Sequence, residues 1–139
     1  MKIEIAFALV FVACSFVKGQ TRDIDLAGTS WKFKGLLSAK GTLFTCPTTY
    51  LINFEKKHKL TGTATLAYNG KYWVKKGNRL KVRGFISKAT PPGQANAGEF
   101  ECRINYSKYL GMGGTLVMHD RELRIVSNEF VTMIFEPVE

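Results

Sequence analysis

Residues 69–83 read NGKYWVKKGNRLKVR, and the spacing of their apolar side chains decides how this part of the chain folds. Apolar and basic residues alternate on both sides of the central Lys76-Gly77-Asn78. A three-residue turn there places Val74 opposite Leu80 and gathers the basic residues on the other face, whereas a two-residue turn would set Val74 opposite Lys81. The stretch therefore predicts a β-hairpin with a three-residue turn, whose glycine or asparagine adopts the left-handed conformation.

The second face of this hairpin combines basic side chains with an indole ring. It predicts a surface that binds a polyanion through six residues: Lys71, Trp73, Lys75, Arg79, Lys81 and Arg83. The alternative is a solvated sheet face, on which charge maintains solubility and the cations lie over Trp73 through cation–π contacts. The binding hypothesis therefore depends on whether this face is open or covered.

Period-two alternation extends the sheet towards the N-terminus, over residues 29–37, 49–55 and 60–68. Asn69-Gly70 is a dipeptide that favours hairpin turns, so we expect a second turn at residues 69–71.

A loop and a helix follow the hairpin. Two prolines exclude regular structure from the loop at 89–98, and residues 99–110 then show helical periodicity up to a stop at Gly111 or Gly113. The predicted apolar stripe of this helix is Phe100, Ile104, Ser107 and Leu110.

Three more strands complete the pattern, at residues 115–119, 122–127 and 130–136, with turns at Asp120-Arg121 and Asn128-Glu129. Strands, one helix and further strands indicate an α+β fold. We expect a small, curved, antiparallel sheet or a cracked β-barrel, packed with one helix.

The first 19 residues predict a signal peptide. The apolar run IAFALVFVACSFV (5–17) is too short to span a bilayer, and the residues before Gln20 favour cleavage there. Residues 20–139 would then form one secreted or extracellular domain with 18 basic and 10 acidic residues, a net charge of +8. The alternative is a bacterial lipoprotein box, FVAC, which would anchor a periplasmic or outer-membrane protein through Cys14.

Cleavage would leave two cysteines, Cys46 and Cys102, which in a secreted chain most simply form one disulfide. Free buried cysteines are the alternative. Asn105-Tyr106-Ser107 is a sequon, so Asn105 is a candidate N-glycosylation site in a eukaryotic secretory pathway.

No combination of residues in the sequence supports catalysis, and we expect a protein that is not an enzyme and holds no cofactor. The two histidines, His58 and His119, are far from each other and from both cysteines, so the paired spacing of a zinc site is missing. Glu99 and Glu101 diverge on the predicted helix, and we expect them on a wet face, where the helix dipole favours them.

Three segments carry a resemblance to a known family. LAGTSWKF (26–33) has a Leu-x-Gly-Thr-x-Trp pattern, INFEKKHKLTG (52–62) has a Phe strand, a polar turn and a Gly, and YNGKYWVKKGNRLKV (68–82) has Gly-x-Tyr and Gly-Asn. In this order they resemble the META domain family (HslJ-like), over about residues 26–136. The family often has Gly-Cys-Asn where this chain reads TATLAYNG, so the pairing of the two cysteines rests on their number alone.

The resemblance implies an open β-barrel covered by a helix, with no enzyme activity and no shared cofactor. From it we expect a secreted domain that binds a protein partner or a small apolar ligand. One alternative is that the basic face binds acidic glycans or anionic membranes, since secretion argues against a genomic target. Another is a lipocalin- or avidin-like ligand-binding barrel, although a lipocalin opens with Gly-x-Trp and here two residues separate Gly28 from Trp31.

Overall fold

The computed structural model describes residues 23–64, 66–87 and 97–138 of the chain. The predicted signal peptide, the alternative anchor at Cys14 and most of the loop at 89–98 lie outside the described residues. The elements of the described part are β1 (Thr29–Leu37), β2 (Leu43–Phe44), β3 (Leu51–Phe54), β4 (Lys59–Ala64), β5 (Leu66–Lys75), β6 (Arg79–Ser87), α3 (Ala97–Met112), β7 (Gly114–His119), β8 (Glu122–Val126) and β9 (Thr132–Pro137).

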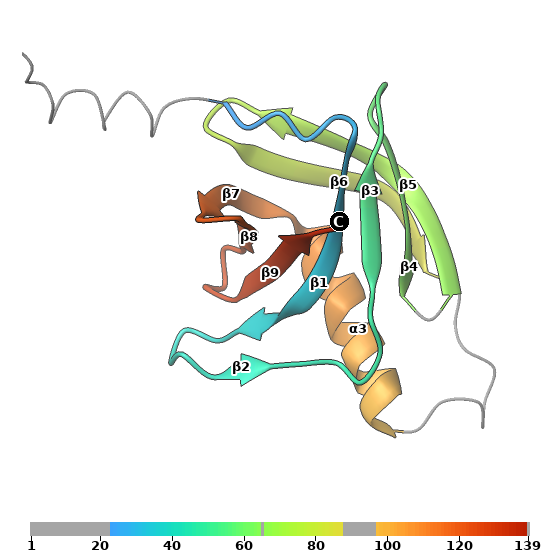
Figure 1. The fold of residues 1–139 in the computed structure, drawn as a ribbon, viewed down its shortest axis with the longest axis vertical. Helices are drawn as coiled ribbons and strands as arrows, with labels where there is room; N and C mark the ends of the chain where they lie inside the picture. The colour runs from blue at the N-terminus through green and yellow to red at the C-terminus, as the bar shows by residue number, and fades with distance from the viewer. Residues whose placement is uncertain (1–22, 65, 88–96, 139) are drawn as a thin grey trace, which may run out of the picture.

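β1 closes the sheet into a barrel because both of its edges are paired. Residues 29–32 pair with β3 on one edge, and residues 31–37 pair with β9 on the other. Each described strand runs antiparallel to its neighbours, and the order β1-β3-β4-β5-β6-β7-β8-β9 returns to β1, while β2 only extends one edge of β1 (Figure 1). The predicted α+β architecture, a β-barrel packed with one helix, is confirmed.

The hairpin of β5 and β6 has the predicted register. Val74 lies opposite Leu80, and the basic residues share the other face. Gly77 and Asn78 have positive φ angles of 82° and 59°, so the three-residue turn contains two left-handed residues. The Asn78 side chain also accepts a hydrogen bond of 2.7 Å from the backbone N–H of Ile24, which ties the start of the described chain to the hairpin tip.

The predicted turn at residues 69–71 is wrong. The chain reverses earlier, at the junction of β4 and β5, and Asn69-Gly70 lies inside β5. Side chains alternate between the two faces of the sheet in the same way whether the chain turns at residues 69–71 or at the junction of β4 and β5. Local periodicity therefore does not distinguish the two turns. Packing decides, because Tyr68 needs a small residue opposite it: it lies across from Gly62, and its hydroxyl group donates a hydrogen bond of 3.0 Å to the carbonyl oxygen of Leu51.

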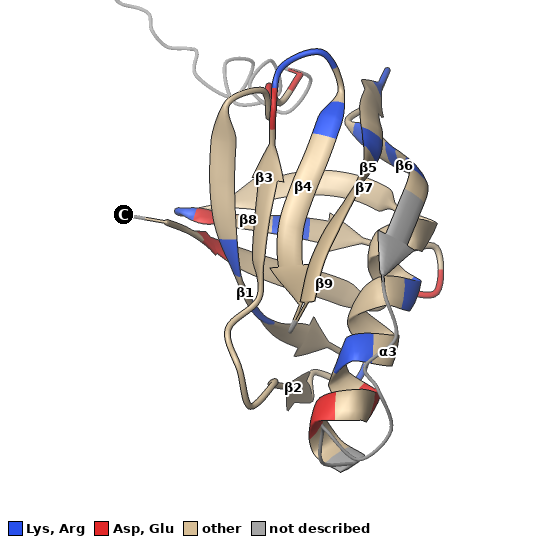
Figure 2. Cartoon of the chain, turned by 90° about the vertical axis from the view of Figure 1, so that its right-hand side faces the viewer, with Lys and Arg blue, Asp and Glu red and all other residues tan. Residues whose placement is uncertain are grey.

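β6 and β7 share the shortest strand interface in the barrel, with two paired positions, Arg79–Thr115 and Leu80–Gly114. Further along, β6 contacts α3 instead, and Figure 2 shows this helix below the β5–β6 hairpin. The helix stops at Gly113, one of the two predicted positions, where a φ angle of 71° ends the helical conformation.

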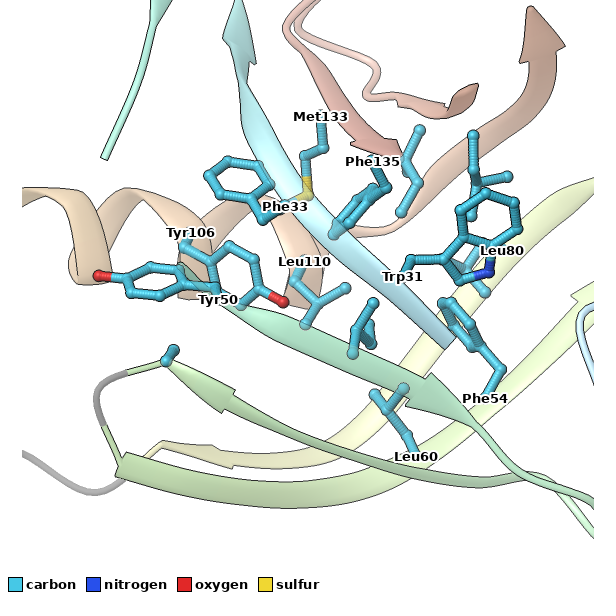
Figure 3. Close-up of a cluster of buried hydrophobic side chains, with 14 of the residues drawn as sticks. Trp31, Phe33, Tyr50, Phe54, Leu60, Leu80, Tyr106, Leu110, Met133 and Phe135 are labelled. Carbon is cyan, nitrogen blue, oxygen red and sulfur yellow. The ribbon is translucent and has the colours of Figure 1, made fainter. Parts of the chain in front are cut away.

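Aromatic side chains fill the interior of the barrel (Figure 3). Tyr50, Phe54, Tyr106 and Phe135 are fully buried, and the rings of Phe33 and Tyr106 meet edge to face with their centroids 4.9 Å apart. An eight-stranded barrel has room inside for side chains or for one small ligand. In this chain the side chains take that room, among them Tyr106 and Leu110 from α3.

The buried face of α3 differs from the predicted stripe. Phe100 and Ile104 of that stripe are 49% and 50% exposed, whereas Leu110 is buried as predicted. It shares the buried face with Cys102 and Tyr106, which lie outside the predicted stripe. Two long-range interactions set the rotation of the helix about its axis. Cys102 forms a disulfide with the segment between β2 and β3, and the Tyr106 hydroxyl group is hydrogen-bonded inside the barrel. The sequence contains both candidate stripes, and its periodicity alone favours the wrong one.

The predicted disulfide is present: Cys46 and Cys102 are bonded, with their Cα atoms 5.7 Å apart. Nearby, Glu99 is buried, which corrects the wet face predicted for it, while Glu101 is exposed. The Glu99 carboxylate accepts hydrogen bonds from the hydroxyl groups of Thr48, at 3.2 Å, and of Tyr50, at 3.3 Å. The bridge and these hydrogen bonds together hold α3 against the start of β3.

Two buried tyrosines make the stability of the barrel sensitive to alkaline pH. The hydroxyl groups of Tyr68 and Tyr106 lie 2.7 Å apart, and burial raises the pKa of both above the ordinary value of 10.0. Above that pH the unfolded chain releases protons that the folded chain keeps. Between about pH 9 and pH 11 the free energy of unfolding should therefore fall by roughly 1 kcal/mol in total for each tyrosine, and more steeply at still higher pH.

Urea unfolding from about pH 9 to about pH 11 measures this slope. Tyr106→Phe should make the slope shallower, because it removes one of the two groups. The same slope in wild type and variant would contradict the prediction.

Candidate polyanion-binding face

The six residues of the predicted polyanion face all lie on the outer surface of β5 and β6. The five basic ones are exposed and Trp73 is half-buried, so no described element covers them. In Figure 2 the basic positions of β4, β5 and β6 gather in the upper part of the barrel, away from the acidic start of α3. The face is open, as the binding hypothesis requires.

The strand register arranges these cations in rows across the sheet. Within a row, the Cβ atoms of paired residues on neighbouring strands are about 5 Å apart. Successive rows are two residues, or about 6.6 Å, apart along β5. The rows are Lys59–Lys71–Arg83, Trp73–Lys81 and Lys75–Arg79. We call these seven residues the basic face.

Lys59 belongs to the basic face although the sequence prediction missed it. It lies on β4, directly opposite Lys71, which is itself opposite Arg83. This position follows only from the pairing of β4 with β5. The predicted turn at residues 69–71 did not include that pairing, so the sequence prediction had no reason to place Lys59 beside Lys71. The run of basic residues at 56–59 was the signal in the sequence that could have suggested it.

Trp73 is in contact with two neighbours. The His58 ring stacks on the indole, with a centroid distance of 5.7 Å and an interplanar angle of 28°, and the Cζ atom of Arg83 lies 5.7 Å from the indole centroid. His58 is in turn placed by its Nδ1 atom, 3.1 Å from the carbonyl oxygen of Tyr72. The indole therefore orients a cation and an imidazole, so it offers less bare ring for a ligand to stack on.

The ion pairs between described Lys or Arg and Glu side chains lie elsewhere on the barrel, away from the basic face. The Lys34–Glu122 pair is 2.7 Å long and the Arg124–Glu122 pair 2.9 Å, both on the β1, β8 and β9 side. Lys108 pairs more loosely with Glu129, at 3.9 Å. Among the described residues, none of the ion pairs includes a member of the basic face, whose charge is therefore not neutralised in this way.

A groove of about 530 Å³ adjoins the basic face, between the tip of the hairpin and the end of α3. The hairpin lines it with Lys75, Lys76, Arg79, Leu80, Lys81 and Val82, and α3 lines it with Gly111 and Met112. Three of the four cations belong to the basic face, and Lys76 adds a fourth from the turn.

Two other open depressions have different chemistry. One, of about 330 Å³, lies between residues 23–27 and the His58 turn and mixes two aspartates with Lys57. The other, of about 490 Å³, lies on the outside of β3, β4 and β5, where threonine and asparagine side chains predominate. Neither concentrates charge of one sign as the groove does.

The remaining predicted residues are dispersed. Asn105 is on α3 and partly exposed, and His119 is exposed in the β7–β8 hairpin beside Asp120. Within residues 23–64, 66–87 and 97–138, no cluster of three or more His, Cys, Asp or Glu side chains is placed to hold a metal ion. In the same part of the chain, no helix has the length and apolar character needed to cross a membrane.

Comparison with known proteins identifies the fold and nothing finer. No family model and no curated protein matches the chain. An NMR structure of a protein from Burkholderia xenovorans is similar, with a TM-score of 0.62 and 17% identity over 99% of this chain and 95% of that one. A second NMR structure has a TM-score of 0.59 and 14% identity, over 81% of this chain and 91% of that one. At these identities the likeness shows that the chain shares its fold with these two proteins.

Proposed function

We propose that this chain is a secreted, non-enzymatic META-like domain that binds an extended polyanion, such as an acidic glycan, on its basic face. The row Lys59–Lys71–Arg83 carries the proposal: three exposed cations lie side by side across three strands, outside the ion pairs of the described part. Like charges directly opposite each other destabilise a sheet. An anionic ligand would offset that repulsion, which gives such a row a physical reason to exist.

Other ligands agree less well with the geometry. A small apolar ligand inside the barrel would have to displace aromatic side chains that are fully buried, such as Tyr50 and Phe54. A flat anionic membrane would meet fewer of the rows at once than a flexible chain, because β4, β5 and β6 curve around the barrel (Figure 1). A protein partner would need an acidic surface to match this face.

Retention on a heparin column tests the proposal. The wild-type protein should elute well above physiological salt, and Lys81→Glu combined with Arg83→Glu should elute at clearly lower salt. A protein that binds the polyanion through fewer cations releases fewer counterions, so the salt dependence should also fall by about one unit of slope for each cation replaced.

The matched control is Lys40→Glu combined with Lys108→Glu, which changes the net charge equally but on other surfaces. It should elute close to the wild type. Elution of the wild type near physiological salt, with no change in the Lys81 and Arg83 variant, would rule the proposal out.

A further inference from the structure

The groove at the end of the basic face is suited to a single anionic group. Four cations of the hairpin line it, and none of the lining residues is acidic. The C-terminal end of α3 contributes only about −0.5 elementary charge, so the groove stays strongly positive. Its volume of about 530 Å³ is enough for a sulfate or phosphate group together with the sugar that carries it.

We infer that this groove binds one sulfate or phosphate group of the polyanion and that longer chains extend from it along β5 to the Lys59–Lys71–Arg83 row. This inference rests on the proposed function. Lys75, in the groove, and Lys71, in the row, are four residues apart on β5, which corresponds to about 13 Å. A ligand shorter than this uses the groove alone, whereas a longer one also reaches the row and binds more tightly.

Gly111 offers a way to close the groove without altering its cations. It lines the groove from the last turn of α3, and a Cβ atom added there would meet nothing within 4 Å. Gly111→Glu introduces a carboxylate that competes with the ligand for the four cations. Gly111→Ala is the matched control, because it adds a side chain without the charge.

The test measures binding of a sulfated disaccharide and a sulfated octasaccharide, both from heparin, by calorimetry at one salt concentration. The wild type should bind the octasaccharide at least about tenfold more tightly than the disaccharide. Gly111→Glu should weaken disaccharide binding at least about fivefold, and Gly111→Ala should leave it within about twofold. Lys71→Gln combined with Arg83→Gln should spare the disaccharide but weaken the octasaccharide about tenfold.

Several results would overturn the inference while leaving the proposed function intact. The first is that the wild type binds the disaccharide and the octasaccharide equally tightly. The second is that Gly111→Glu and Gly111→Ala bind the disaccharide equally tightly. The third is that the Lys71 and Arg83 variant loses affinity for both ligands to the same extent. If the disaccharide binds too weakly to measure, the two Gly111 variants are compared with the octasaccharide, and equal affinity again overturns the inference. Absence of binding of either length to the wild type would refute the proposed function as well. Thermal melting verifies that each variant is folded.

Discussion

Replacing both Cys46 and Cys102 with alanine is expected to lower the free energy of unfolding by about 4 kcal/mol. The bridge spans a sequence separation of 56 residues, and a loop of that length restricts the unfolded chain strongly. It also joins α3 to the segment between β2 and β3, next to the hydrogen bonds of Glu99. The effect is therefore large for a domain whose total stability is on the order of 10 kcal/mol.

Urea unfolding of the variant beside the oxidised and the reduced wild type measures this effect. The reduced wild type should behave like the variant, and both should show a larger m-value, because their unfolded chains expose more surface. Equal midpoints for the variant and the oxidised wild type would show that the bridge contributes little.

Gly62→Ala is expected to lower the free energy of unfolding by about 3 kcal/mol or more, although it adds a single methyl group. A Cβ atom at this position would overlap the carbonyl oxygen of Leu51 and the ring of Tyr68. The Tyr68 hydroxyl group lies 3.0 Å from the same carbonyl oxygen and 2.7 Å from the hydroxyl group of Tyr106. Moving the ring breaks both hydrogen bonds and leaves buried polar atoms without partners.

Gly111→Ala is the matched control, because it is the same substitution at a site with open space and without a positive φ angle. It should be neutral or slightly stabilising, since alanine favours a helix over glycine by about 0.5–1 kcal/mol. Thermal or urea unfolding of the two variants makes the comparison. A change of less than about 1 kcal/mol for Gly62→Ala would mean that the strand can shift to accommodate the methyl group.

Much of the basic face could be predicted because the sequence pattern and the structure depend there on the same short-range rule. In residues 69–83, a single turn length keeps the apolar side chains together, and the structure has that turn. The six predicted residues consequently share one surface. Lys59 and the groove beside Gly111 were not predictable in this way, because they depend on which strand pairs with β5 and on where α3 ends relative to the hairpin.

The errors have a common cause. Asn69-Gly70 has the local signature of a turn, yet the pairing of Tyr68 with Gly62 requires a continuous strand there. Phe100 and Ile104 form an apolar stripe, yet the bridge at Cys102 rotates the helix away from it. In both places a contact between distant segments outweighs a local preference, which is worth only about 1 kcal/mol or less.

The sequence by itself determined the α+β class, the register of the β5–β6 hairpin and the sorting of charge onto one face of the sheet, and it favoured the pairing of Cys46 with Cys102 over free cysteines. The first three features depend on the alternation of side chains over a few residues, which can be read along the chain. The pairing was expected from the two cysteines that would remain once the predicted signal peptide is removed. Only the tertiary structure decided that β1 closes the sheet against β9, that Lys59 completes a row of three cations, and that Glu99 is buried. These outcomes depend on packing between residues far apart in the chain, where side-chain volume and hydrogen-bond partners select one arrangement among several with the same local pattern.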